Sequence, residues 1–215
     1  MPKSKGIRTA QAEATRSALI EAAHRLFGQQ GFYATSTTEI VKAASVTRGA
    51  LQHYFPTKED LFRAVFEQSG RAMVSATAER IAAEGWEGLI ADLRDFIGKI
   101  ATLDTQRISF IDGPAVLGWT EWRRLQADYA LRMVEMAIGD GIAKGLISPQ
   151  PPRALAHLIL SIVEEAALMV VNGPDLKVEP KDVEVAVMSL LSSLNPQRCA
   201  GSSRAERKSL LRQEF

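Results

Sequence analysis

The stretch Gly31-Phe-Tyr-Ala-Thr-Ser-Thr-Thr-Glu-Ile-Val-Lys-Ala-Ala-Ser-Val-Thr-Arg-Gly-Ala-Leu-Gln-His-Tyr-Phe-Pro-Thr-Lys-Glu-Asp-Leu61 decides the fold of this chain. Ser36 and Glu39 have the spacing of a capping box, in which each residue satisfies a backbone amide of the other. This pair predicts a short helix after Ser36, with apolar residues at positions 40, 41, 43 and 44. Thr47 then predicts the N-cap of a second short helix, which ends before Pro56.

The second short helix, from Arg48 to about Tyr54, is expected to bury only one face. Leu51 and Phe55 are spaced as a buried i, i+4 pair, and the remaining faces hold polar side chains. Two short helices joined by a tight turn, the second with an outward polar face, are typical of a helix-turn-helix. Such a second helix is free to enter the major groove of DNA.

At these residues the chain resembles the DNA-binding domain of the tetracycline-repressor (TetR) family of bacterial transcription regulators. The match has many fixed positions at fixed spacing, without gaps, over about a quarter of the chain. The matching motifs are Gly31-Phe32, Thr35-Ser36, Ile40-Val41, Ala44-Ser45-Val46-Thr47, the run 49–55 and Lys58-Glu59-Asp60-Leu61.

Three residues depart from the family pattern. Ser45 replaces the usual turn glycine, so a positive φ at this position would cost about 1 kcal/mol. Val41 replaces a smaller alanine. Gln52 replaces the usual tyrosine, and glutamine can read adenine in a bidentate fashion. This last change alters the expected target sequence and leaves the expected fold unchanged.

The resemblance also implies which residues meet DNA. The first turn of the first short helix would face a phosphate, and the start of the second would reach base edges or phosphates. The implied contacts are Thr37, Thr38, Thr47, Arg48, Gly49, Ala50, Gln52, His53, Tyr54 and Lys58. Tyr54 and Lys58 match the family's phosphate anchors, which fix register without reading sequence. For Arg48, a solvated surface arginine is the alternative.

Charge is distributed unevenly along the chain, although the net charge is only +1. Residues 1–63 carry a net +4, residues 64–196 a net −6, and residues 197–215 a net +3. The positive charge of the first segment coincides with the helix-turn-helix, as attraction to phosphate requires. By itself this asymmetry is within the ordinary variation of protein surfaces.

The rest of the chain has helical periodicity and no alternating strand pattern. We expect an all-α fold of about nine helices, with an N-terminal three-helix, helix-turn-helix domain and a larger helical domain for ligand binding and dimerisation. Expected helices cover residues 9–30, 58–83, 86–103, 107–118 with an interruption at Asp112-Gly113-Pro114, 119–144, 153–171 and 180–194. The expected domains are a disordered basic arm at 1–8, the DNA-binding domain at 9–62, the effector-binding and dimerisation domain at 63–195, and a basic flexible tail at 196–215.

Several classes of protein are disfavoured by composition. We expect no metal or cofactor, because three isolated histidines and the single Cys199 lack the spacing of metal ligands. We expect no membrane span and no secretion signal, which suits a cytoplasmic protein. We expect no enzymatic activity, because no nucleophile–base pair or phosphate loop is evident.

Family resemblance further implies a homodimer and a small-molecule pocket in the second domain. The helix at 153–171 is too apolar for the surface of a monomer, and the expected interface residues are Leu155, Leu158, Ile159, Ile162, Ala166 and Met169. Candidate pocket walls are Trp86, Phe96, Phe110, Trp119, Trp122, Tyr129, Met133 and Met136. Aromatic and methionine residues at helical spacing also form ordinary cores, which is the alternative for this second set.

The sequence therefore predicts a homodimeric regulator, most often a repressor in this family, that binds a palindromic operator and is released by an effector. One alternative is a DNA-binding dimer without an effector. A more distant one is a helical enzyme or lipid carrier with an incidental three-helix head.

Overall fold

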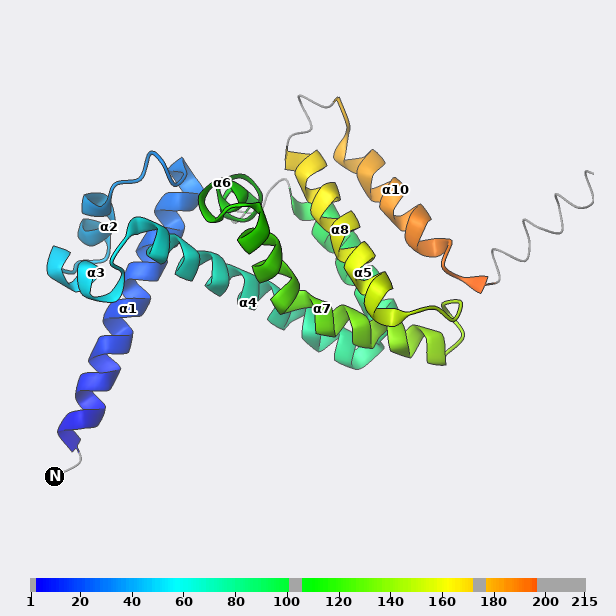
Figure 1. Cartoon of the computed structure of the whole chain (residues 1–215), viewed down its shortest axis with the longest axis horizontal. Helices are drawn as coiled ribbons and strands as arrows, with labels where there is room; N and C mark the ends of the chain where they lie inside the picture. The colour runs from blue at the N-terminus through cyan, green and yellow to red at the C-terminus, as the bar shows by residue number, and fades with distance from the viewer. Residues whose placement is uncertain (1–2, 101–105, 172–176, 197–215) are drawn as a thin grey trace, which may run out of the picture. The chain divides into compact units, whose positions relative to one another are not determined.

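The computed structural model describes residues 3–100, 106–171 and 177–196, without the side chains of residues 3–8, 76 and 129. Every regular element in these ranges is helical, which confirms the all-α class (Figure 1). The elements are α1 (Lys3–Gln30), α2 (Thr37–Ala43), α3 (Arg48–Tyr54), α4 (Lys58–Glu84), α5 (Trp86–Lys99), the π-helix η2 (Arg107–Asp112), α6 (Gly113–Leu117), α7 (Trp119–Ala143), α8 (Pro152–Val171) and α10 (Pro180–Ser192).

Two helix boundaries correct the sequence prediction. α1 begins at Lys3, so residues 3–8 of the expected disordered arm are helical. No proline interrupts this segment, and a single Gly6 costs a helix only about 1 kcal/mol. The Asp112-Gly113-Pro114 sequence does not interrupt the following helix either, because η2 leads directly into α6. Pro114 lies in the first turn of α6, the part of a helix in which proline is best tolerated.

The chain forms two compact units, residues 1–72 with 102–126 and residues 73–101 with 127–215. α4 and α7 each contribute to both units. This division into units is distinct from the functional boundary near residue 62, which stays a prediction. The tail at 197–215 lies outside the described residues.

The first unit is built around three aromatic rings. Phe27, Phe32 and Phe62 lie with ring centroids 5.2 to 5.6 Å apart. Edge contacts between aromatic rings at this distance add to the free energy gained from their burial. Leu51 of α3 and Ile40 of α2 are also buried. The two short helices, α2 and α3, are therefore attached to the rest of the first unit by apolar side chains.

In the second unit, α5, α8 and α10 lie side by side (Figure 1). Their facing surfaces are apolar, with Ile97, Ile159 and Val187 all buried. Gly141 of α7 lets Trp86 approach closely, since a Cβ at this position would lie 3.0 Å from the Trp86 side chain. Gly145, at φ +70°, ends the last turn after α7.

By length and composition, α8 could cross a membrane, since the mean hydropathy of its most apolar window is 1.9. This length and composition are weak evidence for a membrane span, because the core helices of folded proteins share them. Six residues of α8 are buried, including Leu155, Ala166 and Val170, and the helix packs on α5 and α10. Packing within the chain thus explains the apolar character of its inner face without lipid.

Candidate nucleic-acid interface

α2 begins with the capping box that the sequence predicts. The Ser36 amide donates a hydrogen bond to Glu39 Oε2 at 2.8 Å, and the Glu39 amide donates to Ser36 Oγ at 3.2 Å. Hydrogen bonds from the Ser36 side chain and backbone, and from Gln30, lower the pKa of the Glu39 carboxyl. The carboxylate therefore stays charged at the N-terminus of α2, where the helix dipole also favours it.

The turn between α2 and α3 contains a strained residue. Ser45 adopts φ +54°, in the left-handed region that glycine occupies without strain. The Val46 amide donates to the Val41 carbonyl at 3.2 Å and closes the turn. The sequence-based suspicion that Ser45 stands in a glycine position is confirmed.

α3 has a buried underside and a polar outer surface. Thr47 caps it, since Thr47 Oγ1 accepts a hydrogen bond from the Ala50 amide at 3.1 Å. Leu51 and Phe55 are buried, at 4% and 5% exposure. The predicted contact residues on the other faces are exposed or half-buried: Thr47, Arg48, Gly49, Gln52 and His53 are exposed, and Ala50 and Tyr54 are half-buried. α3 therefore presents polar side chains to solvent as a recognition helix does.

The predicted contacts outside α3 divide in two. Thr37 and Thr38, half-buried and exposed, lie in the first turn of α2. Lys58 is engaged inside the unit: its Nζ donates to the carbonyls of Phe32 at 2.9 Å and Thr35 at 3.1 Å. The Lys58 ammonium also lies 4.1 Å from the centroid of the Phe32 ring. The sequence did not indicate these partners within the chain, and the phosphate contact expected of Lys58 stays a prediction.

One candidate contact was missed by the sequence reasoning. Tyr33, in the loop before α2, is 72% exposed, and its ring packs edge-on against Phe32. An exposed tyrosine can donate its phenolic O–H to a phosphate. The sequence did offer a signal: Tyr33 is an aromatic residue that follows Gly31-Phe32 in a loop, outside the apolar periodicity of the neighbouring helices.

The predicted interface residues of α8 fall on two faces. Leu155, Ile159 and Ala166 are buried within the chain and therefore belong to its own core. Leu158 is 61% exposed, and Ile162 and Met169 are half-buried. On α10, Val185 and Leu190 are 57% and 56% exposed. The outward apolar residues are thus Leu158, Ile162, Met169, Val185 and Leu190, which we call the α8/α10 face.

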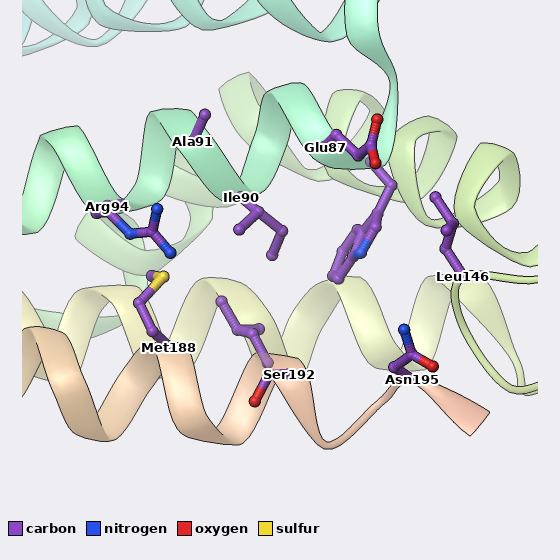
Figure 2. Close-up of a pocket in the computed structure, with 10 residues that line it drawn as sticks. Glu87, Ile90, Ala91, Arg94, Leu146, Met188, Ser192 and Asn195 are labelled. Carbon is purple, nitrogen blue, oxygen red and sulfur yellow. The ribbon is translucent and has the colours of Figure 1, made fainter. Parts of the chain in front are cut away.

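An open groove of about 400 Å³ lies between α5 and α10. In Figure 2, Ile90 and Arg94 of α5 point towards α10, and Met188 of α10 points towards Arg94. Trp86, Leu146, Leu191 and Asn195 also line the groove. Mixed apolar and charged walls suit an amphipathic small molecule.

The predicted pocket walls are not gathered at one place. Trp86 lines the α5/α10 groove. Trp122 is fully buried in the first unit and donates from Nε1 to the Ser109 carbonyl at 2.8 Å, and Phe110 is buried in the same unit. Trp119 and Met136 are 54% and 65% exposed. Phe96 and Met133 are half-buried in the second unit, and the side chain of Tyr129 lies outside the description. Ordinary core packing accounts for Trp122 and Phe110.

An all-helical chain whose N-terminal helix-turn-helix exposes the polar face of its second helix is a DNA-binding transcriptional regulator. Residues 19–65 match the family of bacterial regulatory proteins, tetR family, and residues 86–194 match the tetracyclin repressor-like C-terminal domain. The chain belongs to this family.

Individual relatives agree with the assignment. A crystal structure of a TetR-family transcriptional regulator from Pectobacterium atrosepticum is 30% identical, with a TM-score of 0.76 over 87% of this chain and 97% of the other. The HTH-type transcriptional regulator AcrR of Shigella flexneri is 49% identical over 59 residues, which are only 27% of each chain. The HTH-type transcriptional repressor AcnR of Corynebacterium efficiens is 24% identical over 149 residues, 69% of this chain and 77% of the relative.

Proposed function

We propose that the chain is a homodimeric cytoplasmic repressor that binds a palindromic operator and is released by a small-molecule effector. The main support for the DNA-binding site is the arrangement of α3. Leu51 is buried and anchors the helix, while Arg48, Gln52 and His53 are exposed. A helix held in this way can enter a major groove without uncovering its core. Likeness to a relative named as a repressor supports the direction of regulation.

The operator can be found without knowing the regulated genes. Selection of sequences from a random duplex library by the full-length protein should yield an approximate palindrome, because a symmetric dimer presents two equivalent recognition helices. Footprinting of the region upstream of its own gene should then locate a match. The proposal would be contradicted if the protein bound no duplex in preference to others at any salt concentration.

The α8/α10 face supports the dimer. Large exposed apolar side chains on two adjacent helices are unusual for a monomer and typical of a protein interface. A second copy of the chain is the partner that a palindromic operator requires. Sedimentation at micromolar concentration should give the mass of two chains.

The α5/α10 groove supports an effector site, with Trp86, Ile90 and Met188 as apolar walls and Arg94 as a cationic group. A thermal-shift screen of hydrophobic and charged compounds should find ligands that also release DNA. Met188→Arg should remove the thermal shift, whereas the exposed Met136→Arg outside this groove should leave it intact. If no compound shifts the melting temperature, the result would favour a DNA-binding dimer without an effector.

A further inference from the structure

The backbone of Phe32 is held at both its amide and its carbonyl by side chains of opposite charge. Its amide donates a hydrogen bond to Asp112 Oδ2 at 2.9 Å, and its carbonyl accepts one from Lys58 Nζ at 2.9 Å. Asp112 is the last residue of η2 and Lys58 the first of α4, so two distant elements meet at one residue. Hydrogen bonds with one charged partner are roughly twice as strong as neutral ones.

Neighbouring contacts fix the rest of the same segment. Lys58 Nζ also donates to the Thr35 carbonyl at 3.1 Å, and Thr35 Oγ1 donates to the Gly31 carbonyl at 2.7 Å. Asp112 is only 5% exposed, and Arg107 Nε lies 3.7 Å from its Oδ2 atom. We call these interactions the Phe32 clamp.

The clamp lies directly before the DNA-binding elements. Residues 31–35 directly precede Ser36, which is the N-cap of α2, and α3 follows α2 after a short turn. α2 and α3 are each only 7 residues long, so the path of the chain into Ser36, together with the buried Ile40 and Leu51, sets where α3 points. An unfixed segment would therefore let the recognition helix adopt several orientations.

The geometry of Lys58 also limits its use as a phosphate ligand. An ammonium has three N–H groups, and two of those of Lys58 are taken by carbonyls. Its charge is further satisfied by the face of the Phe32 ring. At most one N–H is left for DNA.

We propose that Asp112 and Lys58 are positioning residues for DNA binding, which orient α3 by fixing the Phe32–Ser36 segment, and that Lys58 does not act through a phosphate. The inference rests on the proposed DNA-binding function. A phosphate contact and a positioning contact differ in salt dependence, because each phosphate neutralised contributes about 0.9 to the slope of log K against log salt.

The test uses the full-length protein and the duplex that it selects from a random library. Lys58→Met and Asp112→Asn should each weaken binding roughly tenfold, the size expected for loss of one charge-assisted hydrogen bond, with an unchanged salt slope. For Asp112→Asn the direction of the change in DNA affinity is decisive, because removal of a negative charge should by electrostatics alone strengthen DNA binding. The double variant should lose less affinity than the sum of the two single losses, since both side chains hold the backbone of the same residue.

Matched controls separate charge from position. Lys42→Met and Glu59→Gln remove the same charges from exposed positions in the same unit. Binding is measured at a temperature at which each variant is folded by circular dichroism, so a merely stabilising contact would leave the affinity unchanged. Should Asp112→Asn not fold, Thr35→Val loosens the same segment by removing one hydroxyl.

A salt slope lowered by about one in Lys58→Met would overturn the proposal for Lys58 and restore the phosphate anchor. Wild-type affinity, or tighter binding, in Asp112→Asn would overturn it for the clamp as a whole. If the wild-type protein selects no duplex, the DNA-binding function itself fails, which is a distinguishable result.

Discussion

Ser45 has a backbone conformation that is unfavourable for any residue with a side chain. At φ +54° an L-residue is strained by about 1 kcal/mol relative to glycine, partly offset by the greater freedom of glycine in the unfolded chain. Ser45→Gly should therefore raise the free energy of unfolding by roughly 0.5–1 kcal/mol in urea denaturation. Ser45→Ala keeps the strain and serves as the control. Equal stability of the glycine and alanine variants would show that the turn relaxes around serine without cost.

Arg48, at the start of α3, is the residue that we expect to read bases. It is exposed, and the Thr47 cap fixes the helix end from which its side chain extends. Arg48→Ala should cost about 1–3 kcal/mol on the selected duplex and relax specificity at one position. The measurement is competition between the selected duplex and single-base variants. A uniform loss across all duplexes would instead make Arg48 a phosphate contact.

At the scale of elements, α4 and α7 are joined within the first unit by an ion-pair cluster. Glu121 of α7 pairs with Arg63 of α4 and accepts a hydrogen bond from Arg124 Nε at 2.7 Å. Hydrogen bonds from Arg124 and then Arg63 lower the pKa of the Glu121 carboxyl to about 2 from 4.5. The charged form is thus stabilised by folding.

The pH dependence follows from the direction of this shift. Because the folded pKa lies below the unfolded one, the stabilisation is fully present above about pH 4.5 and is lost as the pH falls towards 2. Glu121→Gln should therefore lower the melting temperature at pH 7, and the difference from wild type should shrink on acidification. Glu67→Gln, which removes a surface pair with Arg71, is the control and should have little effect at any pH. A difference of undiminished size at pH 2.5 would mean that packing, not charge, explains the variant.

Local elements of the site could be predicted from sequence because their determinants are close together in the chain. The Ser36–Glu39 box and the Thr47 cap each act across three residues, and the strain at Ser45 follows from the turn it occupies. The Phe32 clamp could not be predicted, since Asp112 lies 80 residues from its partner and only tertiary packing joins them. The predicted pocket walls were scattered for the same reason: apolar periodicity shows which face is buried, but not against which element.

At the scale of the whole molecule, the proposed dimer contact through the α8/α10 face would link assembly to DNA binding. Leu158 and Ile162 lie one turn apart on the outer side of α8, away from the buried Leu155 and Ile159. A covered apolar face of this kind would tolerate no charge, because a buried unpaired carboxylate is strongly destabilising. The division of α8 into an inner and an outer apolar face therefore predicts that dimers can be broken without unfolding the chain.

Leu158→Glu and Ile162→Glu should each give folded monomers that lose operator binding, since one recognition helix alone contacts only half of the palindrome. Sedimentation gives the mass, circular dichroism the fold, and titration of the selected duplex the affinity. Ala143→Glu, at an exposed position near the end of α7, should remain a dimer and bind as wild type. A Leu158→Glu monomer that binds the operator tightly would refute the interface, because dimerisation would then contribute nothing to recognition. A dimer that survives both substitutions would instead place the contact between copies on another surface of the chain.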